Sequence, residues 1–334
     1  MDEPLWTARH APAIEDLRQE RARRILEGAI EEPQNLLLHG PPGVGKTAGA
    51  RALGRAAHDQ PDSDLIEINV ADVFDQTKTE IRNDPRFGPF LQGKSSLSKR
   101  DMLNHVLKES ASYAPVTGEY KTLVLDNAES IREDFQQALR RVMEQYHRNT
   151  QFVITTRQPS KLIAPLRSRC VAVPMPAPST DQIADVLAEI AEAEGVEYTR
   201  DGVEFAAGTA GGDVREAILS AQTTAEREGE LTMEAVYEAL DDVGLDDRIE
   251  TMLDAAEAGE FTDARSELDD LLVDEGLSGH EVLEEVLAVG RSRYDGDRLA
   301  RLQRLAGEVD FDLTEGTNDR IQLGHMLAEL GREA

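Results

Sequence analysis

The chain has 334 residues, enough for two or three domains, and 40% of them are hydrophobic, which excludes a disordered tail. Its 65 acidic residues outnumber 36 basic ones, a formal net charge of −29, so in dilute buffer the surface would repel DNA. The sequence has no run of 18 apolar residues and begins with the acidic stretch MDEPLW, which argues against a membrane span or signal peptide and predicts a cytoplasmic protein.

The types of charged residue suggest a second interpretation of the negative net charge. Only seven of the basic residues are lysines, none beyond Lys161, and aromatic residues make up 4%. In molar salt the Debye length falls to about 3 Å and self-repulsion is screened, so we expect a halophilic source, for which net charge says little about partners. A protein without a nucleic-acid role stays open as the alternative. The single Cys170 cannot form an internal disulfide, and paired Cys/His spacing for zinc is absent.

The first half of the chain alternates apolar runs with helical patterns. Strands are predicted at 35–39, 65–70, 122–126, 151–156 and 170–174. Because these runs are dense in Leu, Ile and Val, they fit the buried, mostly parallel sheet of an α/β fold. Helices are predicted between them at 46–58, 100–112 and 130–147. Residues 75–98, rich in Gly, Pro, Ser and polar residues, are predicted to form a long functional loop or insertion.

The stretch GPPGVGKT follows the first predicted strand and opens the first predicted helix. Its residues are Gly40, Pro41, Pro42, Gly43, Val44, Gly45, Lys46 and Thr47. In such a loop, glycines let backbone N–H groups face phosphates, the Lys46 ammonium reaches the β and γ phosphates, and the Thr47 hydroxyl takes a Mg²⁺ position. The sequence therefore predicts a site for ATP or GTP with Mg²⁺.

Asp126 ends the predicted strand TLVLD. An Asp at the end of a strand is, by itself, more often a helix cap. Because a phosphate loop lies about 80 residues upstream, we interpret Asp126 as the carboxylate that holds Mg²⁺.

The stretch PMPAPST at 174–180 predicts a domain boundary, since its prolines cannot continue a strand and Ser179 or Thr180 can cap a helix. The rest of the chain has helical patterns. Helices are predicted at 180–194, 199–209, 213–228 and 232–240, followed by a linker at 241–247 and a second bundle at 248–332.

Four longer stretches carry a family resemblance: ALRRVMEQYHRNTQFVITT (138–156), KLIAPLRSRC (161–170), PAPS (176–179) and GGDVREAI (211–218). They resemble the small subunits of replication factor C, the AAA+ sliding-clamp loader of archaea and eukaryotes. The likeness covers nearly the whole chain, apart from 75–118. It implies an AAA+ P-loop α/β domain with a parallel sheet at 1–178, a helical lid at 179–243 and a helical oligomerisation collar at 244–334.

The resemblance implies roles for two arginines. Arg169 in SRC matches an arginine finger that points into the ATP site of a neighbouring subunit, and such a finger can contribute about 10³ to 10⁵ in hydrolysis rate. Arg215 in GDVRE matches the lid residue that touches the γ-phosphate. Taken alone, Arg169 would be read as a surface ion pair, and Arg215 as a solvated charge after an Asp213 cap.

The chain departs from the family where the family handles water. The hydrolysing members read Asp-Glu-Ala-Asp, whereas this chain reads Asp126-Asn127-Ala128-Glu129. The amide of Asn127 lacks the general-base strength that is typically worth about 10² to 10⁴ in rate. We expect Glu129 on a different face of the turn, where it cannot replace the missing base.

Two further departures lie elsewhere in the site. Arg157 stands where the family has a water-positioning Asn; a cation there can attract the γ-phosphate but cannot accept a hydrogen from water. His10-Ala11-Pro12 stands where the family has Tyr-Arg-Pro beside the adenine. The resemblance with these departures implies a subunit that binds Mg-ATP, hydrolyses it slowly or not at all, and completes a neighbour's site with Arg169.

The implied complex is a hetero-pentamer with other replication factor C subunits, which loads a sliding clamp onto primer-template DNA for replication. Two alternatives remain. One is a self-sufficient, homo-oligomeric AAA+ remodelling ATPase, which Asn127 and Arg157 disfavour. The other is an ATP-gated scaffold in an alternative loader for repair.

Partner contacts are less well defined by the sequence. The family's DNA-backbone segment, Ser-Asp-Glu-Arg-Gly, matches 71–75, where its Arg is missing. Five nearby cations are candidates to replace the missing Arg, with plain surface charge as the alternative: Arg82, Arg86, Lys94, Lys99 and Arg100. For Phe87 and Phe90 we favour a local packing role, and a clamp-binding tip is the alternative. Five apolar residues of the collar are expected in the core of the bundle, and a subunit interface is the alternative. They are Leu268, Leu271, Val282, Leu287 and Leu323.

Overall fold

The computed structural model describes residues 5–70, 77–83, 91, 97–241, 245–273, 277–314 and 318–332. The chain divides into two compact units, residues 1–236 and 237–334. The predicted DNA-backbone segment 71–75 lies outside the described residues, as do Arg86, Phe87, Phe90 and Lys94. Arg82 lies on a helix, but its side chain is not described.

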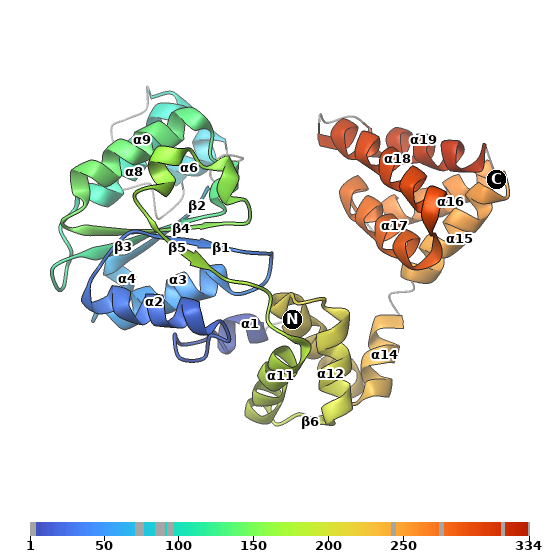
Figure 1. Ribbon diagram of the computed structural model, residues 1–334, viewed down its shortest axis with the longest axis horizontal. Coiled ribbons are helices and arrows are strands. Elements are labelled where there is room, and N and C mark those ends of the chain that lie inside the picture. The colour runs from blue at the N-terminus through green and yellow to red at the C-terminus, as the bar shows by residue number, and fades with distance from the viewer. Residues whose placement is uncertain are drawn as a thin grey trace. The chain divides into compact units, whose positions relative to one another are not determined.

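A five-stranded parallel sheet forms the centre of the first unit (Figure 1). Its strands are β1 (Leu36–His39), β2 (Leu65–Asn69), β3 (Lys121–Asp126), β4 (Thr150–Thr156) and β5 (Val171–Pro174), in the order β2-β3-β4-β1-β5. All five predicted strands and the parallel α/β fold are confirmed. Because the strands are parallel, the carboxyl ends of β1, β3 and β4 meet at one edge of the sheet.

Helices cover both faces of this sheet (Figure 1). The main ones are α2 (Glu20–Glu31) and α3 (Lys46–Ala57) on one face, and α8 (Lys99–Ser112) and α9 (Glu133–Tyr146) on the other. Alternate strand residues pack into two separate cores: Leu36 and Leu38 lie in the α2/α3 core, and Leu37 in the α8/α9 core. Burial on both faces explains why the strands are continuously apolar.

The shorter elements of the first unit are α1 (Trp6–Arg9), α4 (Pro61–Asp64), α6 (Lys78–Asn83), the 3₁₀ turns η1 (Ala128–Ser130) and η2 (Pro159–Lys161), and α10 (Ala164–Arg167). One of them, α6, and the start of α9 correct the sequence predictions. Residues 75–98 were predicted to form a long functional loop or insertion, yet α6 lies within them, because Thr77 and Glu80 exchange hydrogen bonds at its start. The helix predicted from residue 130 begins only at Glu133, after an extended Arg132.

Four helices follow β5 and agree closely with the predicted bounds. They are α11 (Thr180–Glu194), α12 (Arg200–Thr209), α13 (Val214–Glu228) and α14 (Met233–Asp241), and the two-residue strands β6 (Glu197–Tyr198) and β7 (Glu230–Leu231) pair between them. Ser179 caps α11 with a capping box and Asp213 caps α13. Helix α1, which the sequence did not reveal, belongs to this bundle: Trp6 is buried in its core and donates its backbone N–H to Gln222 Oε1 at 2.8 Å.

The second unit is a helical bundle. Its helices are α15 (Leu245–Glu257), α16 (Phe261–Val273), α17 (Gly279–Arg293), α18 (Gly296–Thr314) and α19 (Asp319–Gly331). Since α15 begins at Leu245, it takes up part of the linker predicted at 241–247. The core prediction is confirmed for Leu268, Leu271, Val282 and Leu323, which are buried, and Leu287 packs against them partly buried. Among the described residues, no helix is long and apolar enough to cross a bilayer.

A buried lysine anchors the amino end of β3. Lys121 is 2% exposed and donates from Nζ to the Tyr113 carbonyl oxygen at 2.6 Å. Burial lowers the pKa of Lys121 to about 8, and the nearby Asp64 carboxylate opposes that shift. The same carboxylate accepts the backbone N–H groups of Val116 and Thr117 at 2.7 and 2.8 Å, which fixes the turn before β3.

Lys121→Met should remove one component of the pH dependence of stability. The folded pKa, about 8, lies below the ordinary value of 10.5. Between these values the unfolded chain binds more protons, so the free energy of unfolding should rise with pH in the wild type, by up to about 3 kcal/mol. Urea denaturation of both proteins across this range should give a steeper rise for the wild type; parallel curves would contradict the prediction.

Candidate nucleotide site

The phosphate loop joins β1 to α3 at the carboxyl edge of the sheet. Gly43 and Gly45 adopt φ values of 60° and 95°, in the left-handed region that glycine occupies without a Cβ clash. Gly45 is the N-cap of α3, so the first backbone N–H groups of this helix face the loop. A helix N-terminus behind a glycine-rich turn is suited to binding phosphate.

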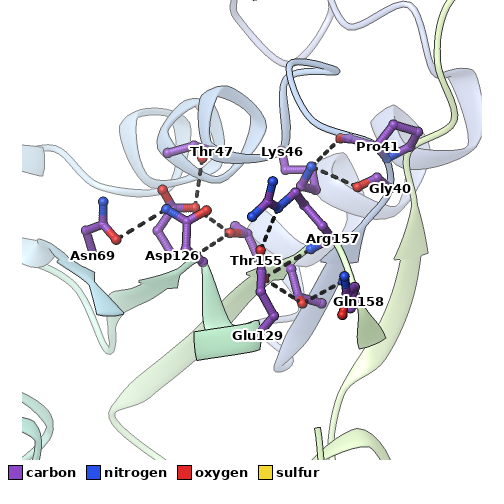
Figure 2. A network of polar contacts seen from close by, with 12 residues as sticks. Gly40, Pro41, Lys46, Thr47, Asn69, Asp126, Glu129, Thr155, Arg157 and Gln158 are labelled. Carbon is purple, nitrogen blue, oxygen red and sulfur yellow. Dashed lines mark hydrogen bonds and ion pairs between the residues drawn. The ribbon is translucent and has the colours of Figure 1, made fainter. Parts of the chain in front are cut away.

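Lys46 is positioned by the loop that precedes it. Its ammonium donates to the Gly40 carbonyl oxygen at 2.9 Å and to the Pro41 carbonyl oxygen (Figure 2). Burial lowers the pKa of Lys46, and the carboxylates of Glu129 and Asp126 oppose that shift. The ammonium therefore lies among groups of both charges beside the phosphate loop.

Asp126 and Thr47, the two predicted Mg²⁺ ligands, are in direct contact. The Thr47 hydroxyl donates to Asp126 Oδ1 at 2.8 Å, and the Thr155 hydroxyl donates to the same oxygen (Figure 2). Hydroxyl and carboxylate oxygens are hard ligands of the kind that Mg²⁺ prefers. The donor set therefore fits this ion.

Asn127 follows Asp126 in a left-handed conformation, φ 55° and ψ 47°, that Asn adopts more readily than most residues. Its side-chain amide donates to Asn69 Oδ1 at 3.2 Å, and its backbone N–H donates to the Thr155 hydroxyl at 3.3 Å. The side chain at this position is thus bound to a second amide at the end of β2.

Glu129 and Arg157 form an ion pair at the edge of the site (Figure 2). Arg157 Nε donates to Glu129 Oε1 at 2.9 Å, and Glu129 Oε2 accepts from the Thr156 hydroxyl at 2.8 Å. We expected Glu129 on a different face of the turn from Asn127; it lines the cavity, because the η1 turn directs it toward the end of β4. Glu129 and Arg157, which both differ from the family pattern, are therefore partners.

The cavity at this edge has a volume of about 690 Å³. Its phosphate end is formed by Pro42 to Ala48, and one wall is formed by N-terminal residues that include His10 and Pro12. The His10 imidazole also pairs with Glu194 on α11. The sequence did not identify several other lining residues, among them Leu5, Thr7, Ala8, Ile183, Val186 and Ile218. The i, i+3 spacing of Ile183 and Val186 was the one available signal.

The helical bundle that follows β5 contacts the phosphate loop directly. Arg215 lines the cavity, and its backbone N–H donates to the Gly43 carbonyl oxygen at 3.3 Å. Asp213 lies so close that a Cβ on Gly43 would be 1.5 Å from Asp213 Oδ1. A glycine is therefore required here by both conformation and space.

Arg169 is not among the described residues that line the cavity. It lies at the surface, where its guanidinium pairs with Glu144 and donates to the Pro165 carbonyl oxygen at 2.7 Å. Of the candidate DNA contacts, Lys99 begins α8, and Arg100 pairs with Asp134 at 3.1 Å. The structure thus brings Lys46, Thr47, Asp126, Asn127, Arg157 and Arg215 together, and leaves Arg169 outside that group.

Comparison with known proteins identifies two matching family models. The model for ATPases associated with various cellular activities matches residues 36–174, and that for the replication factor C C-terminal domain matches 245–329. The replication factor C small subunit of Methanocella arvoryzae is 32% identical, covering 98% of this chain and 96% of the relative. That of Halobacterium salinarum is also 32% identical, covering 90% of this chain and 86% of the relative.

Solved structures support the fold. The RuvB Holliday junction branch migration motor of Thermotoga maritima aligns with a TM-score of 0.53 at 17% identity, covering 82% of this chain and 88% of that one. At this identity the likeness concerns the AAA-type P-loop fold alone.

Gly43→Ala should destabilise the chain by about 1 to 3 kcal/mol, because a left-handed conformation is strained for alanine and its Cβ would displace Asp213. Gly28→Ala is the matched control, since a Cβ there meets nothing within 4 Å and Gly28 lies inside α2. That control should be neutral or stabilising by up to about 1 kcal/mol. Urea denaturation tests both, and equal effects would contradict the described contact.

Proposed function

Because this chain belongs to the replication factor C small-subunit family, we propose that it is an ATP-binding subunit of a clamp loader that places a sliding clamp on primer-template DNA. We also propose that it holds Mg-ATP while hydrolysing it weakly or not at all. The main observation is that Thr47 and Asp126, predicted to bind magnesium, are in contact beside the phosphate loop. At the two positions where the family binds the attacking water, Asn127 and Arg157 are instead hydrogen-bonded to other side chains.

The phosphate loop and the Thr47–Asp126 pair would bind the nucleotide. In our proposal, backbone N–H groups of the loop and Lys46 bind the phosphates, and Thr47 and Asp126 hold Mg²⁺, directly or through water. Bound Mg²⁺ would offset part of the phosphate charge. Arg215 lines the same cavity and supports a role for the lid in contacting the γ-phosphate.

Weak hydrolysis follows from the chemistry of two side chains. The Asn127 amide is not basic enough to take a proton from water, and it is hydrogen-bonded to Asn69. The Arg157 guanidinium has donors only, so it cannot accept a hydrogen from an attacking water. Glu129 is a carboxylate in the cavity, but it is already engaged by Arg157 and Thr156.

Arg169 is proposed to act in trans, as an arginine finger for a neighbouring subunit. Its position outside its own cavity, at the surface, is compatible with that role. A surface ion pair such as Arg169 with Glu144 is weak, so the guanidinium can exchange Glu144 for a phosphate at little cost. An isolated chain would then lack the finger that its own ATP needs.

The domain boundaries predicted at 1–178, 179–243 and 244–334 remain proposals, with the last segment as the collar of a hetero-pentamer. In the second unit, Phe311 and Ile321 are each 66% exposed, although four of the five predicted core residues are buried. Large apolar side chains on the surface of a bundle are suited to a subunit interface.

Asn127→Glu and Arg169→Ala should have unequal effects on the ATPase of the complex reconstituted with its sibling subunits. Arg169→Ala should lower it sharply, by about 10³-fold at each site that it completes. Asn127→Glu should raise it only modestly, by about tenfold or less, since Arg157 still cannot position water.

Arg167→Ala is the matched control, because this exposed arginine lies two residues away, in α10. It should leave the rate unchanged. A large gain from Asn127→Glu together with no loss from Arg169→Ala would contradict the proposed roles.

A halophilic source also remains a proposal, supported by the net charge of −29. Raising KCl from about 0.1 M to about 2 M should increase the temperature of unfolding, because it screens repulsion among carboxylates. Sucrose at equal osmolality controls for exclusion effects and should stabilise less. A falling or constant unfolding temperature in KCl would contradict the proposal.

A further inference from the structure

We propose that Arg157 binds the terminal phosphate of ATP and that Glu129 positions the Arg157 guanidinium for this contact. The site would therefore prefer ATP to ADP. This inference rests on the proposed nucleotide-binding function. It concerns an ion pair formed by two residues that both depart from the family pattern, an Asp replaced by Glu129 and an Asn replaced by Arg157.

Strand pairing places Arg157 beside the phosphate loop. Strand β4 runs parallel to β1 with Thr156 opposite His39, so Arg157 comes one residue past the strand end, next to Gly40. Arg157 and Lys46 both line the cavity, and Figure 2 shows the Arg157 guanidinium on the Lys46 side of Glu129. The guanidinium is therefore close to the ammonium predicted to bind the β and γ phosphates.

Glu129 is fixed independently of the Arg157 side chain. Its side chain is 7% exposed, and Oε2 accepts from the Thr156 hydroxyl at 2.8 Å and from the Arg157 backbone N–H at 3.2 Å. Burial opposes ionisation of Glu129, but hydrogen bonds from Arg157 and Thr156 outweigh it and lower the pKa of the carboxyl. A buried, ionised and anchored carboxylate can orient a flexible guanidinium.

Arg157 retains donors for a second anion. Of its side-chain nitrogens, Nε donates to Glu129, the side chain is 58% exposed, and of the described residues none accepts a hydrogen bond from its two terminal nitrogens. A guanidinium has five N–H groups in a planar fork, so it can bind a carboxylate on one edge and a phosphate on another. Glu129 and a phosphate therefore need not compete for it.

The charges of the pair explain why both partners are needed. With Arg157 in place, Glu129 is neutralised and adds little repulsion toward an incoming phosphate. Without Arg157, a buried carboxylate would stand unpaired beside the γ-phosphate, which is strongly unfavourable. Since ADP has no γ-phosphate, the pair should affect ATP far more than ADP.

The test is calorimetric titration of the full chain with Mg-ATP and with Mg-ADP. Arg157→Gln should weaken ATP binding by roughly tenfold or more, and change ADP binding by about twofold or less. Glu129→Gln should weaken ATP binding by a smaller factor, because the guanidinium is no longer held. The double variant should bind ATP more tightly than Arg157→Gln alone, since the unpaired carboxylate is gone.

Arg24→Gln is the matched control, because this exposed arginine lies outside the cavity and pairs with Glu20 across one turn of α2, at 3.2 Å. It should leave both affinities unchanged. Equal losses for ATP and ADP in Arg157→Gln, or tighter ATP binding in Glu129→Gln, would overturn the inference and leave nucleotide binding intact. Failure of the wild type to bind either nucleotide would instead overturn the proposed function on which the inference rests.

Discussion

The carboxylate of Asp126 is the contact on which the site depends. A single oxygen, Oδ1, accepts hydrogen bonds from Thr47 on α3 and Thr155 on β4, while Asp126 itself ends β3. Three elements are thereby joined at the carboxyl edge of a parallel sheet. The phosphate loop, the predicted magnesium ligands and the substituted residues at 127 and 157 lie around this junction, and Lys121 anchors the same strand at its other end.

Around this junction, the retained and altered residues form a consistent chemical pattern. The phosphate loop, Lys46, Thr47 and Asp126 are in place, whereas the altered residues are paired: Asn127 with Asn69, and Arg157 with Glu129. Random loss of activity would leave polar groups without partners. Because each of these substitutions has a hydrogen-bonding partner, the pattern supports our proposal that the site is maintained for holding nucleotide.

Local patterns predicted much of this structure. Dense runs of Leu, Ile and Val predicted the five strands, the glycine-rich stretch predicted the turn between β1 and α3, and Ser179 and Asp213 marked helix starts, because each signal is contained within a few adjacent residues. Long-range contacts were not predictable. Trp6 reaches Gln222 across 216 positions, and the Glu129–Arg157 pair spans 28, so both depend on how the elements pack. The T-x-x-E signal that starts α6, formed by Thr77 and Glu80, is local but lies in a stretch whose Gly, Pro and Ser content favours a loop.

The central claim is that this chain holds ATP intact and leaves hydrolysis to a neighbour that receives Arg169. The most direct measurement is a single-turnover experiment, in which the isolated chain is loaded with Mg²⁺ and ATP radiolabelled at the γ-phosphate and the bound nucleotide is followed over time. The account predicts that the label stays on bound ATP for hours. Conversion to bound ADP within minutes by the isolated chain would contradict it.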